Sequence, residues 1–134
     1  MKVGLDTSVV LRLLTGEPET QARCALKEVQ ELMGRGAALL VSDLVVAEVY
    51  FALQYHYGVP KAEALRSIAK FLTDSGVKAL GMAATVIMVP NLASANPGFV
   101  DRLIHAEYMR SVNEIITFEK AGVRLTGARV LHDS

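Results

Sequence analysis

The sequence predicts an α/β fold, a three-layer sandwich in which helices flank a mostly parallel central sheet. Short apolar segments of strand length alternate along the chain with amphipathic segments of helical period. The continuous run AALLV at residues 37–41 is typical of a parallel strand that is buried on both faces. A chain of 134 residues is long enough for one core and short for two, so we expect a single domain over residues 1–134.

The first half of the chain divides into elements at glycine and proline. Residues 3–5 predict a strand, and Val9–Leu14 continue at helical density until Gly16-Glu17-Pro18 breaks the pattern. Residues 19–34 form an amphipathic helix that ends at a Gly-Arg-Gly stop, and the buried strand at 37–41 follows. Helices are then expected from residues 42–43 to about 57, and from Pro60 to about 72.

The second half is predicted to continue the alternation of strands and helices. Residues 77–89 contain one or two short strands, for which the segment VIMV (86–89) is the best candidate. A helix over residues 98–110, a strand at 114–118 and a short final element around 123–131 complete the fold.

Composition excludes several classes of protein. Lys plus Arg and Asp plus Glu both number 14, so there is no basic excess of the kind that drives strong non-specific nucleic-acid binding. The single Cys24 cannot form an internal disulfide, and no signal peptide is evident, so we expect a cytoplasmic protein. Residues 79–100 carry no formal charge, but their prolines and asparagines make a membrane helix improbable, and no membrane partner is expected.

Two acids follow predicted strands directly. Asp6 comes after the first strand and Glu119 after the strand EIITF. The carboxyl ends of parallel strands meet at one edge of a sheet, where ligands collect, so both acids are expected at that edge. Helix capping is the alternative explanation for Asp6, as it is for its neighbours Thr7 and Ser8.

Two further acids lie in predicted helices. Glu48 falls on an apolar stripe with Leu44, Phe51 and Tyr55, where a lone charge is costly unless something pairs with it. The alternative is that Glu48 bonds an arginine or reaches past the edge of the stripe. Asp101 lies in the first turn of its helix, where the helix dipole alone would also favour an acid.

Two other acids compete with this set of four and are assigned simpler roles. Asp43 is expected to start its helix, and Glu107 to face solvent.

If Asp6, Glu48, Asp101 and Glu119 converge, a cation is required to hold them together. Two carboxylates about 4 Å apart repel by about 4 kcal/mol at an effective dielectric near 20. A site made only of oxygen ligands suits Mg²⁺ or Mn²⁺. Zinc fits badly because the three histidines are scattered and Cys24 stands alone. The expected chemistry is hydrolysis of a phosphodiester by metal-activated water.

The same residues in the same order resemble the PIN-domain ribonucleases of the VapC toxin type. The resemblance rests on VGLDTSVV, SDLVVAEV, GFVDRLIHAEY and EIITFE followed by AGVRLTG, and it spans essentially the whole chain. It implies a PIN-like fold and identifies Asp6, Glu48, Asp101 and Glu119 as catalytic and metal-binding acids, with Thr7 or Ser8 in support. It also implies an Mg²⁺- or Mn²⁺-dependent endoribonuclease, usually homodimeric, that a small antitoxin holds inactive.

The chain departs from the family pattern in three places. Glu119 stands where aspartate is more frequent, and its extra methylene moves the carboxylate outward by about a bond length, which bears on a second metal position. The segment between VIMV and Asp101 is short, so a helix there is expected to be truncated. His105 and Glu107 replace residues that are usually small or apolar.

Arg12 and Arg102 lie near proposed ligands in the sequence and are candidates for binding the RNA phosphates, although exposed arginines are more often only solvated. The aromatic residues of the helix over 43–57 exceed the needs of a small core and predict a surface for a dimer partner or an antitoxin, with core packing as the alternative. They are Tyr50, Phe51, Tyr55 and Tyr57.

Two other functions stay open at this point. One is a degenerate, non-catalytic PIN-fold module that binds RNA or an antitoxin, which Glu119 and the zero net charge favour. The other is a phosphatase or phosphoacceptor domain, which also places an aspartate after the first strand. Such sites want a second acid two residues later, where this chain has Ser8, or a late lysine in a context that Lys120 does not match.

Overall fold

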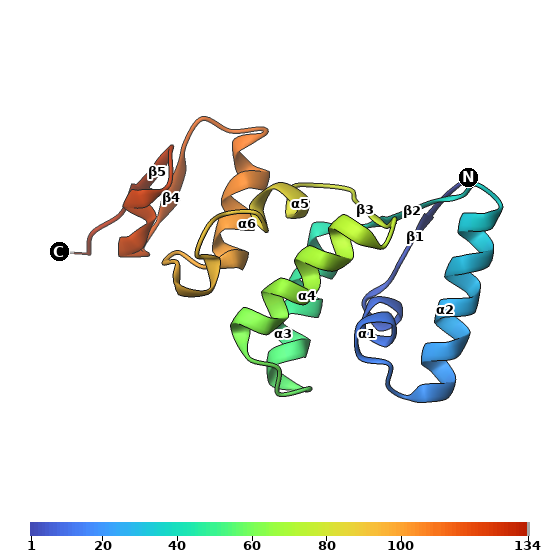
Figure 1. Ribbon diagram of the computed structural model, residues 1–134. Coiled ribbons are helices and arrows are strands. Elements are labelled where there is room, and N and C mark those ends of the chain that lie inside the picture. The colour runs from blue at the N-terminus through green and yellow to red at the C-terminus, as the bar shows by residue number, and fades with distance from the viewer. Residues whose placement is uncertain (134) are drawn as a thin grey trace.

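The computed structural model describes residues 1–133, in which helices and parallel strands alternate (Figure 1). The predicted α/β class is confirmed. In chain order the elements are β1 (Lys2–Gly4), α1 (Thr7–Thr15), α2 (Glu19–Gly34), β2 (Ala38–Val41), α3 (Asp43–Tyr55), α4 (Lys61–Asp74), β3 (Lys78–Ala79), α5 (Ala83–Val86), the 3₁₀ turn η1 (Leu92–Ser94), α6 (Phe99–Met109), β4 (Ile115–Thr117), the 3₁₀ turn η2 (Lys120–Arg124) and β5 (Ala128–Val130).

The N-terminal strands form a parallel sheet in the order β1-β2-β3. Val3 of β1 lies opposite Leu39 of β2, and Val41 lies opposite Ala79 of β3. Leu39 and Val41 are each only 2% exposed, as the apolar run predicts. The sheet order makes β1 an edge strand, with β2 on one side only.

Local sequence fixes the ends of the helices that follow β1 and β2. Gly16 ends α1 with φ of 72°, a conformation that favours glycine, and its N–H donates to the Arg12 carbonyl. The Ser42 hydroxyl accepts a hydrogen bond from the Val45 N–H at the start of α3. Helix α1 packs against α2 and α3, and α3 packs against α4.

The predicted strand VIMV is wrong. Val86 ends the short helix α5 and residues 87–89 continue as turns, while the strand of this region is β3, at Lys78–Ala79. Val86 and Ile87 are buried because they face the core from a helical turn. A short apolar run has no period that separates a strand from one buried turn of helix.

The C-terminal strands form a second sheet, which corrects the expectation of one central sheet. β4 and β5 pair in parallel, with Ile116 opposite Arg129, and neither pairs with β1 in the described chain. The side chain of Arg129 also donates to Glu114 at 3.2 Å, and this contact raises the pKa of Arg129. In Figure 1 this sheet lies at the opposite end of the molecule from β1.

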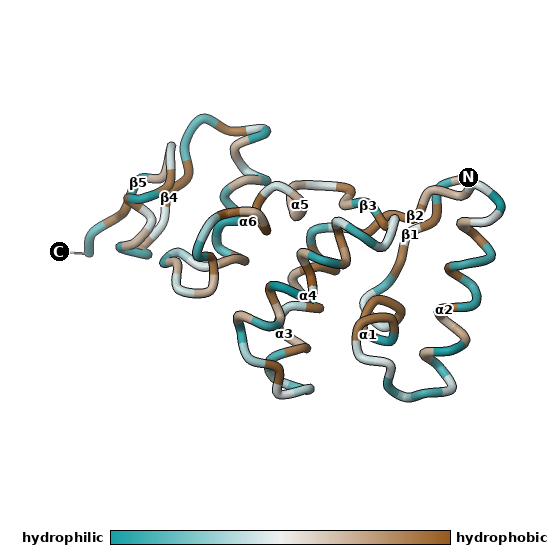
Figure 2. Tube along the Cα trace, viewed as in Figure 1, coloured by the Kyte–Doolittle hydropathy of each residue, from teal (hydrophilic) through white to brown (hydrophobic). Residues whose placement is uncertain are grey.

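A buried contact holds α6 where it is. Phe99 and Leu103 are 1% and 2% exposed, and the Phe99 ring meets the Tyr50 ring of α3 edge-on at 5.2 Å between centroids. The core therefore runs from the first sheet through α3 and α4 to α6, but does not include β4. Figure 2 shows hydrophobic colour in β1 and β2 and again in β4, where it belongs to exposed residues such as Ile116.

Within the described residues, no helix combines the length and apolar character needed to cross a bilayer.

Candidate active site

Asp6 occupies the corner between β1 and α1 with a free carboxylate. Its backbone carbonyl accepts from the N–H groups of Val9 and Val10, while its side chain makes no capping hydrogen bond. The side chain is exposed. Side-chain capping therefore does not explain an aspartate at this position.

Glu48 and Thr7 are joined across the molecule. The Thr7 hydroxyl donates to Oε1 of Glu48 at 2.8 Å, which links the first turn of α1 to the second turn of α3. This bond leaves Oε2 of Glu48 available. Thr7, which follows Asp6 in the sequence, therefore has the geometry of a residue that orients the Glu48 carboxylate.

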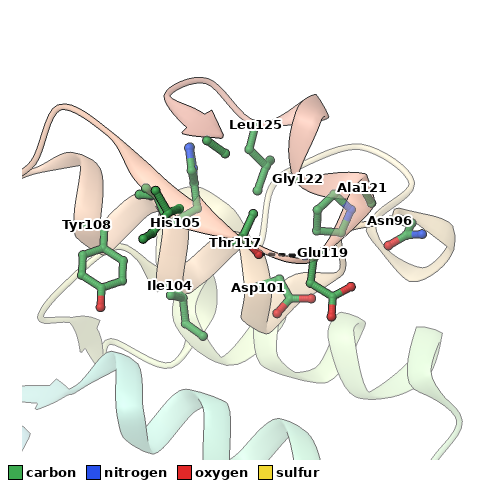
Figure 3. A pocket seen from close by; sticks show the side chains of 14 residues that line it. Asn96, Asp101, Ile104, His105, Tyr108, Thr117, Glu119, Ala121, Gly122 and Leu125 are labelled. Atoms are coloured by element: carbon green, nitrogen blue, oxygen red, sulfur yellow. Dashed lines mark hydrogen bonds between the residues drawn. The ribbon is translucent and has the colours of Figure 1, made fainter. Parts of the chain in front are cut away.

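Asp101 and Glu119 line one cavity of about 200 Å³ between α6 and the second sheet. Figure 3 shows both acids, together with Asn96, among the side chains that line this cavity. Glu119 is positioned by its backbone, because its N–H donates to the Thr117 hydroxyl at 3.0 Å. The two acids are exposed, and lie in α6 and in the turn that directly follows β4.

The structure does not bring the four acids into one cluster. Asp101 and Glu119 line one cavity, while Glu48 is bonded to Thr7, the sequence neighbour of Asp6. Asp6 and Glu48 belong to the first sheet and its helices. Asp101 and Glu119 belong to the C-terminal unit, by which we mean α6, β4, η2 and β5. Residues 1–133 contain no group of three or more His, Cys, Asp or Glu side chains placed to hold a metal ion. The predicted convergence fails within one chain because β4 does not lie beside β1.

None of the four acids is neutralised by a basic residue. The salt bridges among residues 1–133 are Arg23–Glu19, Arg35–Glu31 and Arg129–Glu114. The alternative that Glu48 pairs with an arginine therefore does not hold in the part of the chain that is described.

The remaining predicted site residues have other surroundings. Ser8 and Arg12 line a cleft between β1, α1 and α2, where Nε of Arg12 donates to the Gln21 side chain at 2.7 Å. Nε of Arg102 donates to the Pro97 carbonyl at 2.6 Å. Each arginine thus has one nitrogen committed to local structure, and binding of phosphate by the remaining nitrogens stays a prediction.

Asp43 has a structural role that the sequence did not reveal. Its two oxygens accept from the N–H groups of Met82 and Ala83 at 2.9 and 3.0 Å, so it caps α5 and ties it to the start of α3. A side chain at Gly81 would collide with this carboxylate. Glu107 is exposed, as predicted.

The aromatic residues of α3 divide between core and surface. Tyr50 is 6% exposed and belongs to the core, whereas Phe51 and Tyr55 are 43% and 78% exposed and stack on each other. Leu44, on the same stripe, is 74% exposed. Glu48 therefore lies in an apolar stripe at the surface, where its charge is solvated.

The chemistry of the donors suits a hard divalent cation, but their number in one chain does not. Carboxylate oxygens are the ligands that Mg²⁺ and Mn²⁺ prefer, and Asn96 adds an amide oxygen beside the second pair. Residues 1–133 of one chain gather no group of three or more such side chains, and Asp101 and Glu119 are the two that share a cavity. A site with all four needs a different arrangement of the two halves.

Comparison with known proteins gives one match. The sequence model of the family described as PIN domain matches residues 3–120, a span that includes all four acids. No curated protein and no solved structure matches the chain.

Proposed function

Because the chain belongs to the PIN domain family, whose members are typically nucleases, we propose that it is an Mg²⁺- or Mn²⁺-dependent endoribonuclease. The observation that carries the proposal is that the family match spans four acids, of which Asp101 and Glu119 line one cavity and Glu48 is bonded by Thr7. Asp6, Glu48, Asp101 and Glu119 come from distant parts of the chain, are all exposed, and have no ion-pair partner among residues 1–133.

Asp101 and Glu119 line one cavity, where their two negative charges repel and solvent screens the repulsion. A divalent cation bound there would offset the repulsion and supply an activated water and charge stabilisation for phosphodiester hydrolysis. The residues of this chain would hold the cation, and Thr7 would orient Glu48 toward it.

The proposed biological role is that of a VapC-type toxin in a toxin-antitoxin pair. The exposed apolar stripe of α3, made of Leu44, Phe51 and Tyr55, supports a protein partner, because side chains of this size are seldom left in water without one. A small antitoxin that covers this stripe would also cover Glu48. RNA recognition would rest on the shape of single-stranded loops.

Substitution of the acids tests the nuclease proposal. Asp6→Asn and Asp101→Asn should each abolish Mn²⁺-dependent cleavage of a structured RNA, because each removes one negative ligand with little change in volume. The matched control is Asp74→Asn, which changes an exposed acid at the end of α4 and should leave cleavage intact. Cleavage that survives either site substitution would show that the proposed residues do not carry the reaction.

A non-catalytic PIN module that binds RNA or an antitoxin is the second candidate. It is favoured by the observation that one chain gathers no more than two of the acids in one place. Calorimetric titration with Mn²⁺ separates the two proposals. A nuclease should show saturable binding that Asp101→Asn removes, whereas a degenerate module should show only the weak binding of scattered carboxylates.

A further inference from the structure

The outer edge of β1 is free to accept another strand. The Ala38 N–H donates to the Met1 carbonyl and the Leu5 N–H donates to the Leu40 carbonyl, so the odd-numbered residues of β1 bond β2. The backbone groups of Lys2 and Gly4 therefore point to the opposite edge. Both residues are exposed, and a Cβ built at Gly4 would meet no atom within 4 Å.

β4 has a free edge of the same kind. The Ile115 N–H donates to the Gly127 carbonyl, and the Thr117 carbonyl accepts from the Leu131 N–H, so these residues face β5. The backbone of Ile116 faces away. The side chains of Ile116 and Phe118 are 58% and 68% exposed, which is unusual for apolar residues of a parallel strand.

The two free edges match in register. Asp6 is the second residue beyond the last residue of β1, Gly4, and Glu119 is the second residue beyond the last residue of β4, Thr117. Parallel pairing of β1 with β4 at the usual spacing of about 4.8 Å would set these two carboxylates side by side. Asp101 would accompany Glu119, because both line one cavity.

An apolar cleft adjoins the free edge of β1. It has a volume of about 450 Å³ between β1, α1 and α2, and its lining includes Val3, Val9, Val29 and Leu32. Strand addition to a sheet edge gains specificity when alternate side chains enter such a cleft. Ile116 of β4 and Phe118, which directly follows the strand, lie two residues apart and have the size and polarity to occupy it.

In the described structure the same chain does not supply this strand. β4 follows α6, whose Phe99 and Leu103 are buried in the core, with the Phe99 ring against Tyr50 of α3. Figure 1 shows β1 and β4 at opposite ends of the molecule. A second copy presents a β4 that already follows its own α6, so the core contacts of α6 stay intact in both copies.

We propose that two copies of this chain exchange their C-terminal units, with β4 of each copy completing the sheet of the other in the order β3-β2-β1-β4-β5. The exchange is reciprocal, so it closes as a two-fold dimer. Each site then holds Asp6 and Glu48 from one copy and Asp101 and Glu119 from the other. The assignment of these acids to catalysis rests on the proposed function, but the exchange itself does not.

The exchange is tested first in metal-free buffer, without reference to cleavage. Light scattering should find a dimer in the micromolar range. Ile116→Lys and Phe118→Lys should convert it to a folded monomer, because both side chains are exposed in the single chain. The control is Met88→Lys, an exposed apolar residue outside β1, α6 and β4, which should leave the dimer intact. A wild-type monomer throughout this range would overturn the proposal.

Cross-linking identifies which strand meets β1. Lys2→Cys and Ile116→Cys are combined in a Cys24→Ser background and treated with a short bismaleimide. Exchange predicts a covalent dimer on a denaturing gel, and neither cysteine alone should give it. A linked product of monomer mass would show that β4 pairs within its own chain, and an unlinked dimer would show that the copies meet elsewhere. Both results would contradict the exchange.

Complementation then tests the composite site. Asp6→Asn and Asp101→Asn are co-expressed with different tags, and the mixed dimer is isolated. Exchange leaves one of its two sites with all four acids, so it should recover about half of the wild-type cleavage, while each variant alone has none. Sites built within single chains would give no recovery. If the wild type itself does not cleave RNA, the nuclease proposal fails while dimerisation and cross-linking still decide the exchange.

Discussion

At the scale of single residues, the hydrogen bond from Thr7 to Glu48 joins two residues that are 41 positions apart in the sequence. Thr7 is the sequence neighbour of Asp6, so the bond links the corner after β1 to α3. The bond fixes one carboxylate oxygen and leaves the other free. A hydroxyl beside an acid was visible in the sequence, but the choice between Thr7 and Ser8 was not, because the first turn of a helix can direct either side chain toward a neighbour.

Removal of this hydroxyl should impair cleavage more than stability. Thr7→Val keeps the shape of the side chain but lets the Glu48 carboxylate rotate, and loss of a positioning partner of a metal ligand typically costs about 10- to 100-fold. Thr7→Ser should retain most of the activity. Cleavage rates and thermal unfolding of both variants would check this, and an equal loss in both would contradict a role for the hydroxyl.

Asp43 shows how an acid without a catalytic role is used. Its two hydrogen bonds to the backbone of Met82 and Ala83 satisfy donors that open α5. Asp43→Ala should therefore lower the free energy of unfolding by about 1–2 kcal/mol, as loss of a capping residue does. Urea denaturation measures the change, with Glu107→Ala as an exposed control from the same shallow surface hollow, for which no loss is expected.

At the scale of elements, the position of α6 decides the architecture. Its N-terminal residues enter the core beside Tyr50, whereas Ile104 and Tyr108 are 50% and 52% exposed. One side of α6 is thus anchored in the core of its own chain, and another side leaves large apolar side chains exposed, as at a surface that contacts a second protein. The sequence predicted this helix nearly to the residue, but the partner of each face depends on residues that are remote in the sequence.

The anchor of α6 should account for a large share of the stability. Phe99→Ala removes a fully buried ring and should lower the free energy of unfolding by about 3–5 kcal/mol. Tyr55→Ala removes a ring that is 78% exposed and should cost less than about 1 kcal/mol in the isolated chain. Denaturant unfolding of the two variants at equal protein concentration tests the difference.

At the scale of the whole molecule, binding of Mn²⁺ should stabilise the fold. An ion that binds only the native state adds about 2.7 kcal/mol when present at 100 times its dissociation constant. We expect the unfolding temperature to rise with Mn²⁺ in the wild type and to rise much less in Asp101→Asn. An equal rise in both would place the bound ion away from the proposed acids.

The sequence by itself determined the α/β class, the long helices α1 to α4 and α6, the strands β1, β2 and β4, and which four acids to consider, while their exposure and lack of ion pairs came from the structure. Periodicity, chain breakers and buried apolar runs are local properties, and they fix local structure. The failure at VIMV came where four residues are too few to show a period. Asp43 resembled any helix-start residue because its partners lie about 40 positions away.

Only the tertiary structure decided how the strands divide into sheets and which acids meet. Pairing between β1 and β4 depends on where the intervening helices pack, and here α6 is anchored by Phe99, whose buried ring contacts Tyr50 of α3. The physical reason is that strand pairing joins residues remote in the sequence, and local propensity does not fix it. In the single chain this arrangement leaves β1 and β4 each with an unpaired edge.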